Sequence, residues 1–268
     1  MGPIIFSTKF FELHTLWVFF AIAIITTTII LIKLSIKNSL KIQFISENAW
    51  KIILWGIIGA RIMAIITNYN IYFYELSSQS LLHLLYIWDK GLDLWGAIIA
   101  ITVYFYFLCK KSDQNFWKWI DVLVPAAILG LAIENIGLFF DGANYGTPTQ
   151  LPWAVNFENP AVKYAVPIHP TQIYAFIYSL TIFIFLWLLR QTKKIKDMEQ
   201  SGLIGLIGIG GYSLLHFLEE FIRGDDTLMI FSIRIGQIGS FIAIAGTVTI
   251  IYRRYLRKNT SHLHSKQI

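Results

Sequence analysis

The chain has 268 residues, of which 56% are hydrophobic, 16% aromatic and only 14% charged, and its mean hydropathy is +0.59. An ordinary soluble domain carries about 25% charged residues. This composition therefore excludes a typical soluble protein and a disordered one. A single cysteine excludes a disulfide framework and a cysteine-based metal cluster. The composition is that of an integral membrane protein.

Seven stretches are apolar and long enough to cross a membrane, which takes about 20 mostly apolar residues per helix. In chain order they are Leu13–Leu31, Trp50–Thr67, Leu92–Leu108, Ile120–Phe140, Thr171–Leu189, Leu203–Ile222 and Phe231–Ile251. The first is expected not to be a cleavable signal peptide, because its apolar part is too long and no small-residue cleavage site follows it. We predict an all-α integral membrane protein with seven transmembrane helices. It has one polytopic membrane domain over residues 1–257 and a polar cytoplasmic tail over residues 258–268.

The basic residues predict the orientation of these spans. Most of the 22 Lys and Arg residues follow the first, third, fifth and seventh spans, which places them on one side of the membrane. The positive-inside rule then puts the N-terminus outside and the C-terminus in the cytoplasm of a multi-pass cell-membrane protein. A nucleic-acid partner is not expected, because the basic charges are dispersed over four short loops.

The longest loop on the non-cytoplasmic side runs from residue 141 to residue 168. It is rich in glycine and proline and contains Trp153. Turn-forming residues together with an interfacial aromatic residue predict a small ordered cap on the outer face.

Ionisable residues within the predicted spans are costly and are candidates for function. Asp121, at the inner end of the fourth span, is either such a candidate or a residue that is simply solvated or caps that helix. The densest group is HFLEEFIR, in which helical spacing puts His216, Glu220 and Arg223 on one stripe with Tyr212. Such a stripe can accept a proton and bind an anion, although a purely structural network is the alternative. A metal site is not expected, because only one histidine lies on the stripe.

Two further polar positions lie outside this stripe. Arg61 lies mid-span among small residues. It is expected either to form an interhelical salt bridge, with Glu134 or Glu220 as its partner, or to bind a lipid phosphate as a cation. His169 and Gln172 open the fifth span three residues apart, so both can face one cavity. A lone histidine is more often a structural hydrogen-bond partner than a catalyst, and both interpretations stay open.

The segment HPTQIY at 169–174 resembles the HP-[ST]-Q-[LI]-Y segment of prolipoprotein diacylglyceryl transferases. Other segments resemble motifs of that family in the same order: GARI at 59–62, KGLDLWGAI at 90–98, VPAAILGLAIENIGLFFDGANYGTPT at 124–149, GYSLLHFLEEFIR at 211–223 and IRIGQIGSFIAIAG at 233–246. The resemblance covers nearly the whole chain. It implies transfer of the diacylglyceryl group of phosphatidylglycerol, or a similar anionic phospholipid, to the lipobox cysteine thiol in the signal peptide of lipoprotein precursors, without a cofactor.

The resemblance and the polar stripe together predict roles for individual residues. The expected substrate-binding residues are Arg61, Asn135, Gly137, Gly146, His169, Gln172, Arg223 and Arg234, and the expected catalytic residues are His216, Tyr212 and Glu220. The thiol must become a thiolate before it can attack, and a cation beside the phosphate would stabilise the departing negative charge.

The chain departs from the family at positions where chemistry is expected. The family's histidine, arginine, asparagine and glutamate positions are occupied by Trp95, Asn135, Leu138 and Ala143, and His216 stands where the family has an arginine. Tryptophan cannot accept a proton, so His216 becomes the expected base, with His169 as the second candidate. The alternative is a non-catalytic or retasked member that binds lipid or lipoprotein precursor. A transporter is a weaker interpretation, because paired repeats and broken helices are not recognisable in the sequence.

Overall fold

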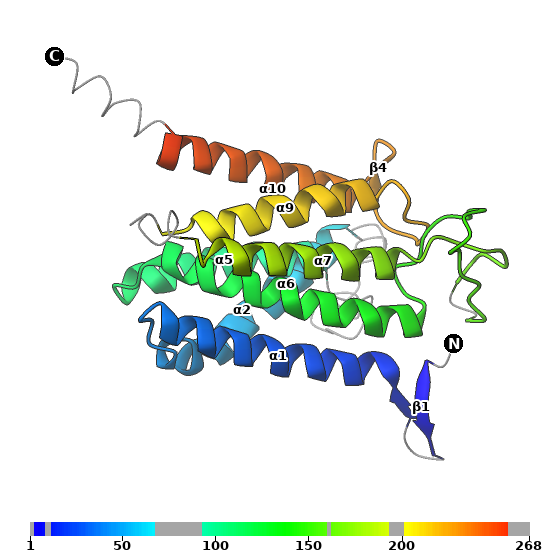
Figure 1. Cartoon of the computed structure of the whole chain (residues 1–268), viewed down its shortest axis with the longest axis horizontal. Helices are drawn as coiled ribbons and strands as arrows, with labels where there is room; N and C mark the ends of the chain where they lie inside the picture. The colour runs from blue at the N-terminus through cyan, green and yellow to red at the C-terminus, as the bar shows by residue number, and fades with distance from the viewer. Residues whose placement is uncertain (1–2, 9–11, 68–92, 160–161, 193–200, 257–268) are drawn as a thin grey trace, which may run out of the picture. The chain divides into compact units, whose positions relative to one another are not determined.

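The computed structural model describes residues 3–8, 12–67, 93–159, 162–192 and 201–256 (Figure 1). Most of these residues are helical. The helices are α1 (Thr15–Lys37), α2 (Gln43–Thr67), α5 (Leu94–Lys111), α6 (Phe116–Asp141), α7 (Thr171–Leu189), α9 (Leu203–Glu219) and α10 (Ile235–Ile251), followed by a π-helical turn at Tyr252–Leu256. Two antiparallel hairpins complete the described elements, β1 (Ile4–Ser7) with β2 (Glu12–His14) and β3 (Met229–Ile230) with β4 (Ile233–Arg234).

Six of the described helices are long and apolar enough to cross a membrane. The seventh apolar helix, α9, has 17 residues and a length of about 26 Å, slightly short of a hydrocarbon core of about 30 Å. It nevertheless packs along α7 and α10 as a full member of the bundle (Figure 1). The prediction of an all-α, multi-pass membrane protein is confirmed.

The predicted spans differ from the helices mainly at their ends. The fifth span coincides with α7. The last predicted span begins four residues too early, because residues 231–234 form a turn and strand β4 ahead of α10. The sixth predicted span extends three residues beyond the end of α9 at Glu219. Residue 92, the start of the third predicted span, and the tail at 258–268 lie outside the described residues.

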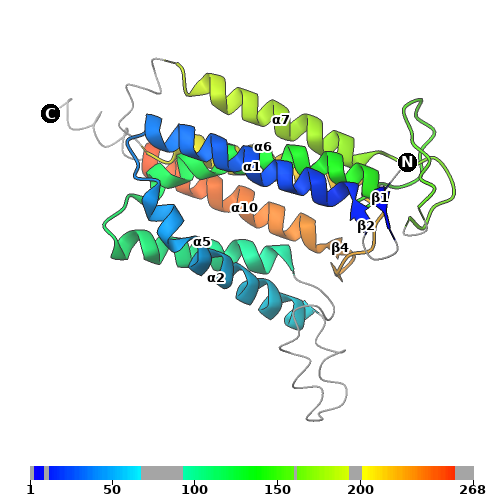
Figure 2. The same ribbon diagram turned by 90° about the horizontal axis from the view of Figure 1, so that it is seen from below.

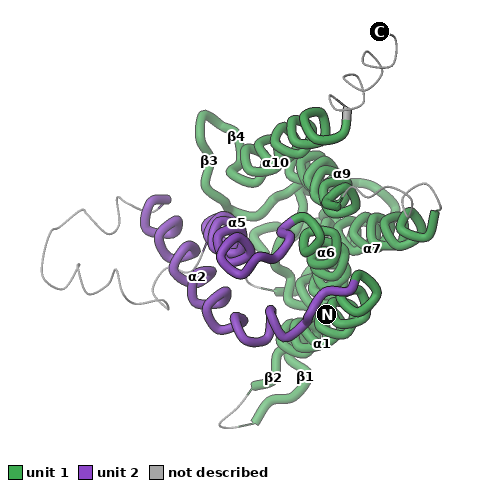
Figure 3. Tube along the Cα trace, turned by 90° about the vertical axis from the view of Figure 1, so that its left-hand side faces the viewer, with its two compact units in different colours: residues 1–38, 117–268 green, residues 39–116 purple. Residues whose placement is uncertain are grey.

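The chain divides into two compact units (Figure 3). One comprises Met1–Asn38 and Trp117–Ile268 and the other comprises Ser39–Phe116. In the second unit α2 and α5 cross closely, because Gly59 and Gly96 bring the two backbones together where any side chain would collide. The Asp93 carboxylate caps α5 by accepting hydrogen bonds from the backbone amides of Trp95 at 2.8 Å and Gly96 at 3.2 Å.

In the first unit, small residues let α6 approach its neighbours. A side chain at Gly130 or Gly137 of α6 would collide with residues of α1, and one at Gly205 of α9 would collide with Ile120 of α6. Buried aliphatic residues fill the space between α6, α7 and α9; they are Ile128, Ile182, Leu186 and Ile204. These contacts fix the first unit as one packed bundle, also seen from below in Figure 2.

Asp121 stabilises a different helix from the one that carries it. Its carboxylate accepts hydrogen bonds from the backbone amides of Gly202 at 2.6 Å and Gly205 at 2.8 Å, at the start of α9. Asp121 therefore caps α9 and not its own helix, α6, so the expectation that it caps its own helix is wrong. A carboxylate at this position satisfies free amides and complements the positive end of the α9 dipole.

The loop between α6 and α7 forms the ordered cap that the sequence predicts. Pro148 and Val155 each form a β-bridge with Ile168, and Tyr145, Val162 and Ile168 make a small apolar core. The cap lies at the end of the bundle that also carries the β1–β2 and β3–β4 hairpins (Figures 1 and 2).

Candidate functional site

A buried ion pair joins the end of α9 to the start of α10. Nε of Arg234 donates to Oε2 of Glu220 at 2.6 Å, and both side chains are over nine-tenths buried. Nη1 of Arg223 lies 3.7 Å from the other carboxylate oxygen of Glu220. Gly236 permits this contact, because a Cβ at that position would collide with the Glu220 carboxyl group.

Asp225 binds both arginines. Its carboxylate accepts hydrogen bonds from Nε and Nη2 of Arg223 at 2.7 and 2.5 Å, and from Nη2 of Arg234 at 2.8 Å. The Asp225 backbone carbonyl accepts a further bond from Nη1 of Arg234 at 2.9 Å. Burial raises the pKa of the Asp225 carboxyl, but the hydrogen bond and charge of Arg223, with the charge of Arg234, outweigh this and hold that pKa below its ordinary value.

We call Glu220, Arg223, Asp225 and Arg234 the arginine–carboxylate network. It contains two cations and two anions, so its formal charges cancel. Paired, hydrogen-bonded charges are the form in which ionisable side chains can be buried. The network holds the α9 end, the β3–β4 hairpin and the α10 start in one fixed arrangement.

His216 lies one helical turn from this network. Its Nδ1 is 3.3 Å from the hydroxyl of Ser240 on α10, and its Nε2 is 3.9 Å from Oε1 of Glu220, longer than a hydrogen bond. The Tyr212 ring also lies near the imidazole, with ring centroids 5.9 Å apart. The His216 side chain remains 20% exposed, so a small group can reach it.

A second polar pair lies on the side of α9 that faces α7. The Tyr178 hydroxyl donates to Oε2 of Glu219 at 2.7 Å, and the Tyr178 and Tyr212 rings meet edge to face at 5.6 Å. Tyr212 thus lies between the Glu219 pair and His216. This arrangement fixes the Tyr212 ring from both sides.

The cap contacts the network through backbone and side chain. Nη2 of Arg223 donates to Oδ1 of Asn144 at 3.0 Å, and Gly146 forms a β-bridge with Arg223. A Cβ at Gly146 would collide with the backbone carbonyl of His169 at 2.6 Å and would press on that of Ile222 at 3.1 Å. Glycine is therefore required by the close approach of three chain segments.

Gln172 ties the start of α7 to the cap. Its Nε2 donates to the backbone carbonyl of Ala143 at 2.5 Å, and the residue is completely buried. The neighbouring Thr171 hydroxyl donates to the carbonyl of Asn144 at 2.6 Å. These bonds position the segment that carries Asn144, which in turn contacts Arg223.

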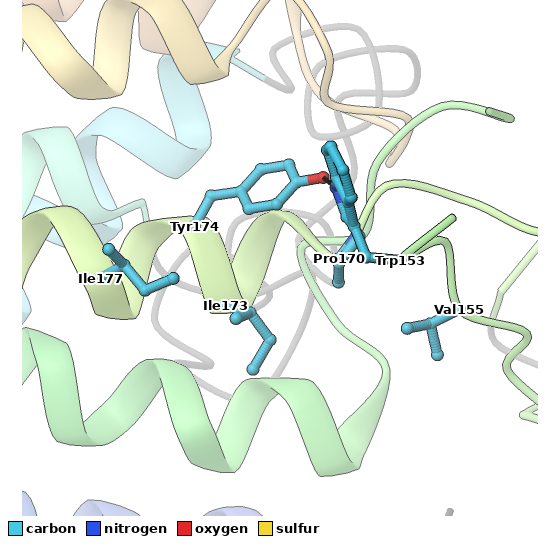
Figure 4. A pocket seen from close by; sticks show the side chains of 6 residues that line it. All are labelled: Trp153, Val155, Pro170, Ile173, Tyr174 and Ile177. Carbon is cyan, nitrogen blue, oxygen red and sulfur yellow. Dashed lines mark hydrogen bonds between the residues drawn. The ribbon is translucent and has the colours of Figure 1, made fainter. Parts of the chain in front are cut away.

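His169 belongs to a separate polar group beside an apolar groove. Its Nδ1 lies 3.2 Å from the Tyr174 hydroxyl, which accepts a hydrogen bond from Nε1 of Trp153 at 2.7 Å. Burial lowers the pKa of the His169 imidazole below its ordinary value. Tyr174 and Trp153 also line a groove of about 400 Å³, with Val155, Pro170, Ile173 and Ile177 (Figure 4).

The remaining expected site residues lie elsewhere. Asn135 is buried on α6, where its amide nitrogen donates to the backbone carbonyl of Leu131 at 2.7 Å. Gly137 allows the close packing of α6 on α1. Arg61 is buried in α2, in the second unit, and its role toward a lipid phosphate stays a prediction.

Sequence reasoning brings Tyr212, His216, Glu220 and Arg223 together, and the structure groups them with Arg234. It missed Asp225, Ser240 and Asn144. Asp225 follows Arg223 by two residues, a spacing that a helical pattern does not indicate. Ser240 is three residues after Gln237, whose side-chain oxygen accepts from the backbone amide of Arg234 at 3.1 Å, so a polar stripe on α10 was an available signal.

The fold and this cluster define the protein as a multi-pass membrane protein with a buried ionic site at one end of its bundle. The sequence pattern of the family called prolipoprotein diacylglyceryl transferase matches residues 3–253. The chain belongs to this family, and it is a multi-pass enzyme of transferase type in the cell membrane.

Three relatives illustrate the match, and each is named phosphatidylglycerol–prolipoprotein diacylglyceryl transferase. The one from Finegoldia magna is 32% identical over 259 residues, covering 93% of this chain and 96% of the relative. The one from Synechocystis is 30% identical over 269 residues, covering 96% and 91%. The one from Clostridium tetani is 33% identical over 230 residues, covering 84% and 86%. These names give no support to the alternative of a non-catalytic member.

Proposed function

We propose that this protein transfers the diacylglyceryl group of phosphatidylglycerol to the lipobox cysteine thiol of lipoprotein precursors. The match to the family over residues 3–253 is the single observation that carries this proposal. The ionic site at the end of α9 supports it, because it offers a titratable imidazole beside fixed charges.

The reaction needs a base and a stabilised leaving group. The cysteine sulfur attacks the glycerol carbon that bears the phosphate oxygen, forming a thioether. The carbon–oxygen bond breaks, and its electron pair leaves with glycerol phosphate. The thiol proton must pass to a base, because the thiolate is the reactive nucleophile.

His216 is the base that this site best supports. In the tautomer that donates from Nδ1 to Ser240, Nε2 carries the lone pair that can accept the thiol proton. The imidazolium formed would then lie 3.9 Å from the Glu220 carboxylate, which favours the charged form. Tyr212 and Glu220 are therefore proposed to orient His216 and stabilise its protonated state.

The two arginines of the network are proposed to have different roles, with Arg223 acting on the phosphate. Arg234 uses Nε, Nη1 and Nη2 in bonds to Glu220 and Asp225, which leaves it mainly a positioning role. Arg223 holds its partners with Nε and Nη2, and among the described residues its Nη1 makes only the longer contact to Glu220. Nη1 of Arg223 is thus the donor best able to turn toward a phosphate oxygen.

The other substrate-binding residues are proposed to act around this centre. Asn135 can offer a second amide hydrogen to the phosphate without adding charge. The apolar groove beside His169 suits a hydrocarbon segment of a substrate, because its lining is aromatic and aliphatic (Figure 4). Gly146 and Gln172 shape the cap, which is proposed to lie on the outer face with the N-terminus outside and the C-terminus in the cytoplasm.

The test is turnover by the purified protein in vesicles that contain phosphatidylglycerol, with a synthetic lipobox peptide as acceptor. Thioether-linked product should form, and it should not form with a Cys→Ser acceptor peptide. If the native chain is inactive and Trp95→His together with Asn135→Arg restores turnover, the family fold serves another purpose here and the proposal fails.

A further inference from the structure

The β3–β4 hairpin ends in an exposed apolar tip. Phe231 is 95% exposed, and Met229, Ile230 and Ile233 are exposed as well. The run from Leu228 to Ile233 contains no charged residue. A solvated loop of this kind would ordinarily carry polar residues, so this tip is suited to an apolar environment.

The turn at the tip is held in an unfavourable conformation. Phe231 and Ser232 have φ of 49° and 64°, the combination of a two-residue type I′ turn. Asn-Gly and similar pairs favour that turn, whereas a bulky residue such as phenylalanine at positive φ is rare. The sequence thus keeps a large apolar side chain at a position where its backbone is strained.

The base of the hairpin is rigid. Arg234 ends β4 and is fixed by Glu220 and Asp225, and Ile235 donates a backbone hydrogen bond to the carbonyl of Leu228 at 3.0 Å. The tip is therefore a short prong on a firm support, since only the pair Ile230–Ile233 separates it from the pair that contains the buried Arg234.

The prong points sideways from the bundle. In Figure 1 the hairpin turns away from the axis of α10, and in the end-on view of Figure 3 β3 and β4 extend outward from α10. Because α10 crosses the membrane, a sideways prong at its end lies along the membrane surface. The spanning helices that flank it also expose apolar side chains, including Leu218 of α9 and Phe241 of α10.

We propose that the tip of the β3–β4 hairpin inserts into the lipid leaflet at this end of α9 and α10 and anchors the arginine–carboxylate network at the headgroup level. Aromatic and aliphatic side chains bind at this depth of a bilayer. The binding partner of the apolar tip is thus membrane lipid. This inference rests on the membrane-spanning fold and holds whether or not the proposed reaction does.

The test places a fluorescent probe at the tip. Cys109 is the only cysteine, so a Cys109→Ala background with Phe231→Cys accepts a single NBD label. In lipid nanodiscs the label should emit at a shorter wavelength than the same label at Gln150→Cys, an exposed position of the cap. Lipids with a nitroxide near the top of the acyl chain should quench the Phe231 label and leave the Gln150 label unquenched.

A second site guards against damage from the label. Ile230→Cys should show the same blue shift and the same quenching, with the elution volume of both labelled proteins unchanged. Equal emission and no lipid quenching at both tip sites would overturn the proposal. A shift that appears only when lipobox peptide is added would assign the tip to the peptide instead, and would also overturn it.

Discussion

Arg234 and Glu220 form a buried ion pair, with Nε 2.6 Å from Oε2, that joins the residue just before α10 to the residue just after α9. Fourteen positions separate the two residues, and the β3–β4 hairpin lies between them. The pair thus closes the base of the hairpin and fixes the carboxylate that faces His216.

Removing one member of this pair should strongly destabilise the protein. Glu220→Gln or Arg234→Met would leave a buried charge with one partner fewer, which typically costs about 3–5 kcal/mol. The double variant should lose less free energy of unfolding than the two single variants lose together, because neither member of the pair then remains as a charge without the other. Unfolding in detergent, followed by far-ultraviolet circular dichroism, measures this cycle.

The exposed pair Lys163–Asp226 provides the control. Its atoms are 2.9 Å apart, but the Asp226 side chain is 92% exposed. Lys163→Ala should leave the midpoint of unfolding unchanged, since water screens the pair. Equal destabilisation by Lys163→Ala and Arg234→Met would contradict the assignment of the buried network.

Asp225 should make the protein sensitive to acid. Its pKa is lowered in the folded state, so its ionised form contributes stability above its ordinary pKa of about 3.9, and that contribution is lost as pH falls through the folded value. The unfolding midpoint should fall with pH below about pH 4. Asp225→Asn should be less stable at neutral pH, and its unfolding midpoint should fall less steeply below about pH 4. An equally steep fall in the variant would show that Asp225 is not the group responsible.

Gly146→Ala should destabilise the cap. The added methyl group meets the backbone of His169 and Ile222, which cannot move without breaking the β-bridge to Arg223. Overpacking of this kind costs about 1–3 kcal/mol. Gly211→Ala is the matched control, because a Cβ there meets no atom within 4 Å and alanine favours the α9 helix. Equal effects of the two substitutions would show that the close approach is not limiting.

Asp121→Ala should weaken the start of α9. It removes the acceptor of the Gly202 and Gly205 amides, and loss of such a cap costs about 1–2 kcal/mol. Glu47→Ala, at an exposed position of α2, is the comparison. Amide hydrogen exchange in the first turn of α9 should be faster in Asp121→Ala than in the native chain and in Glu47→Ala. The same exchange rates in all three proteins would contradict the capping role.

Hydropathy alone predicted the helices because burial in lipid imposes a length and an apolar composition on each span. It misplaced the start of α10, because Phe231 and Ile233 are as apolar in a hairpin tip as in a helix. Helical spacing predicted that His216 and Glu220 lie close together, since residues four apart on a helix are neighbours on one face.

The remaining contacts of the site depend on tertiary structure. Asp225 reaches both arginines only because the chain reverses after α9, and Ser240 meets His216 only because α10 packs on α9. Glu219 belongs to the HFLEEFIR segment, but its partner Tyr178 is 41 residues away on α7. Sequence spacing carries no signal for such pairs.

The measurement that tests the proposed chemistry most directly is the rate of diacylglyceryl transfer by the native chain and by His216→Ala, in vesicles of phosphatidylglycerol with a lipobox peptide. Loss of the general base should lower the rate by on the order of 10²- to 10⁴-fold. Ser240→Ala, which removes only the hydroxyl at Nδ1, should retain more activity than His216→Ala. Full activity in His216→Ala would contradict the assignment of His216 as the base.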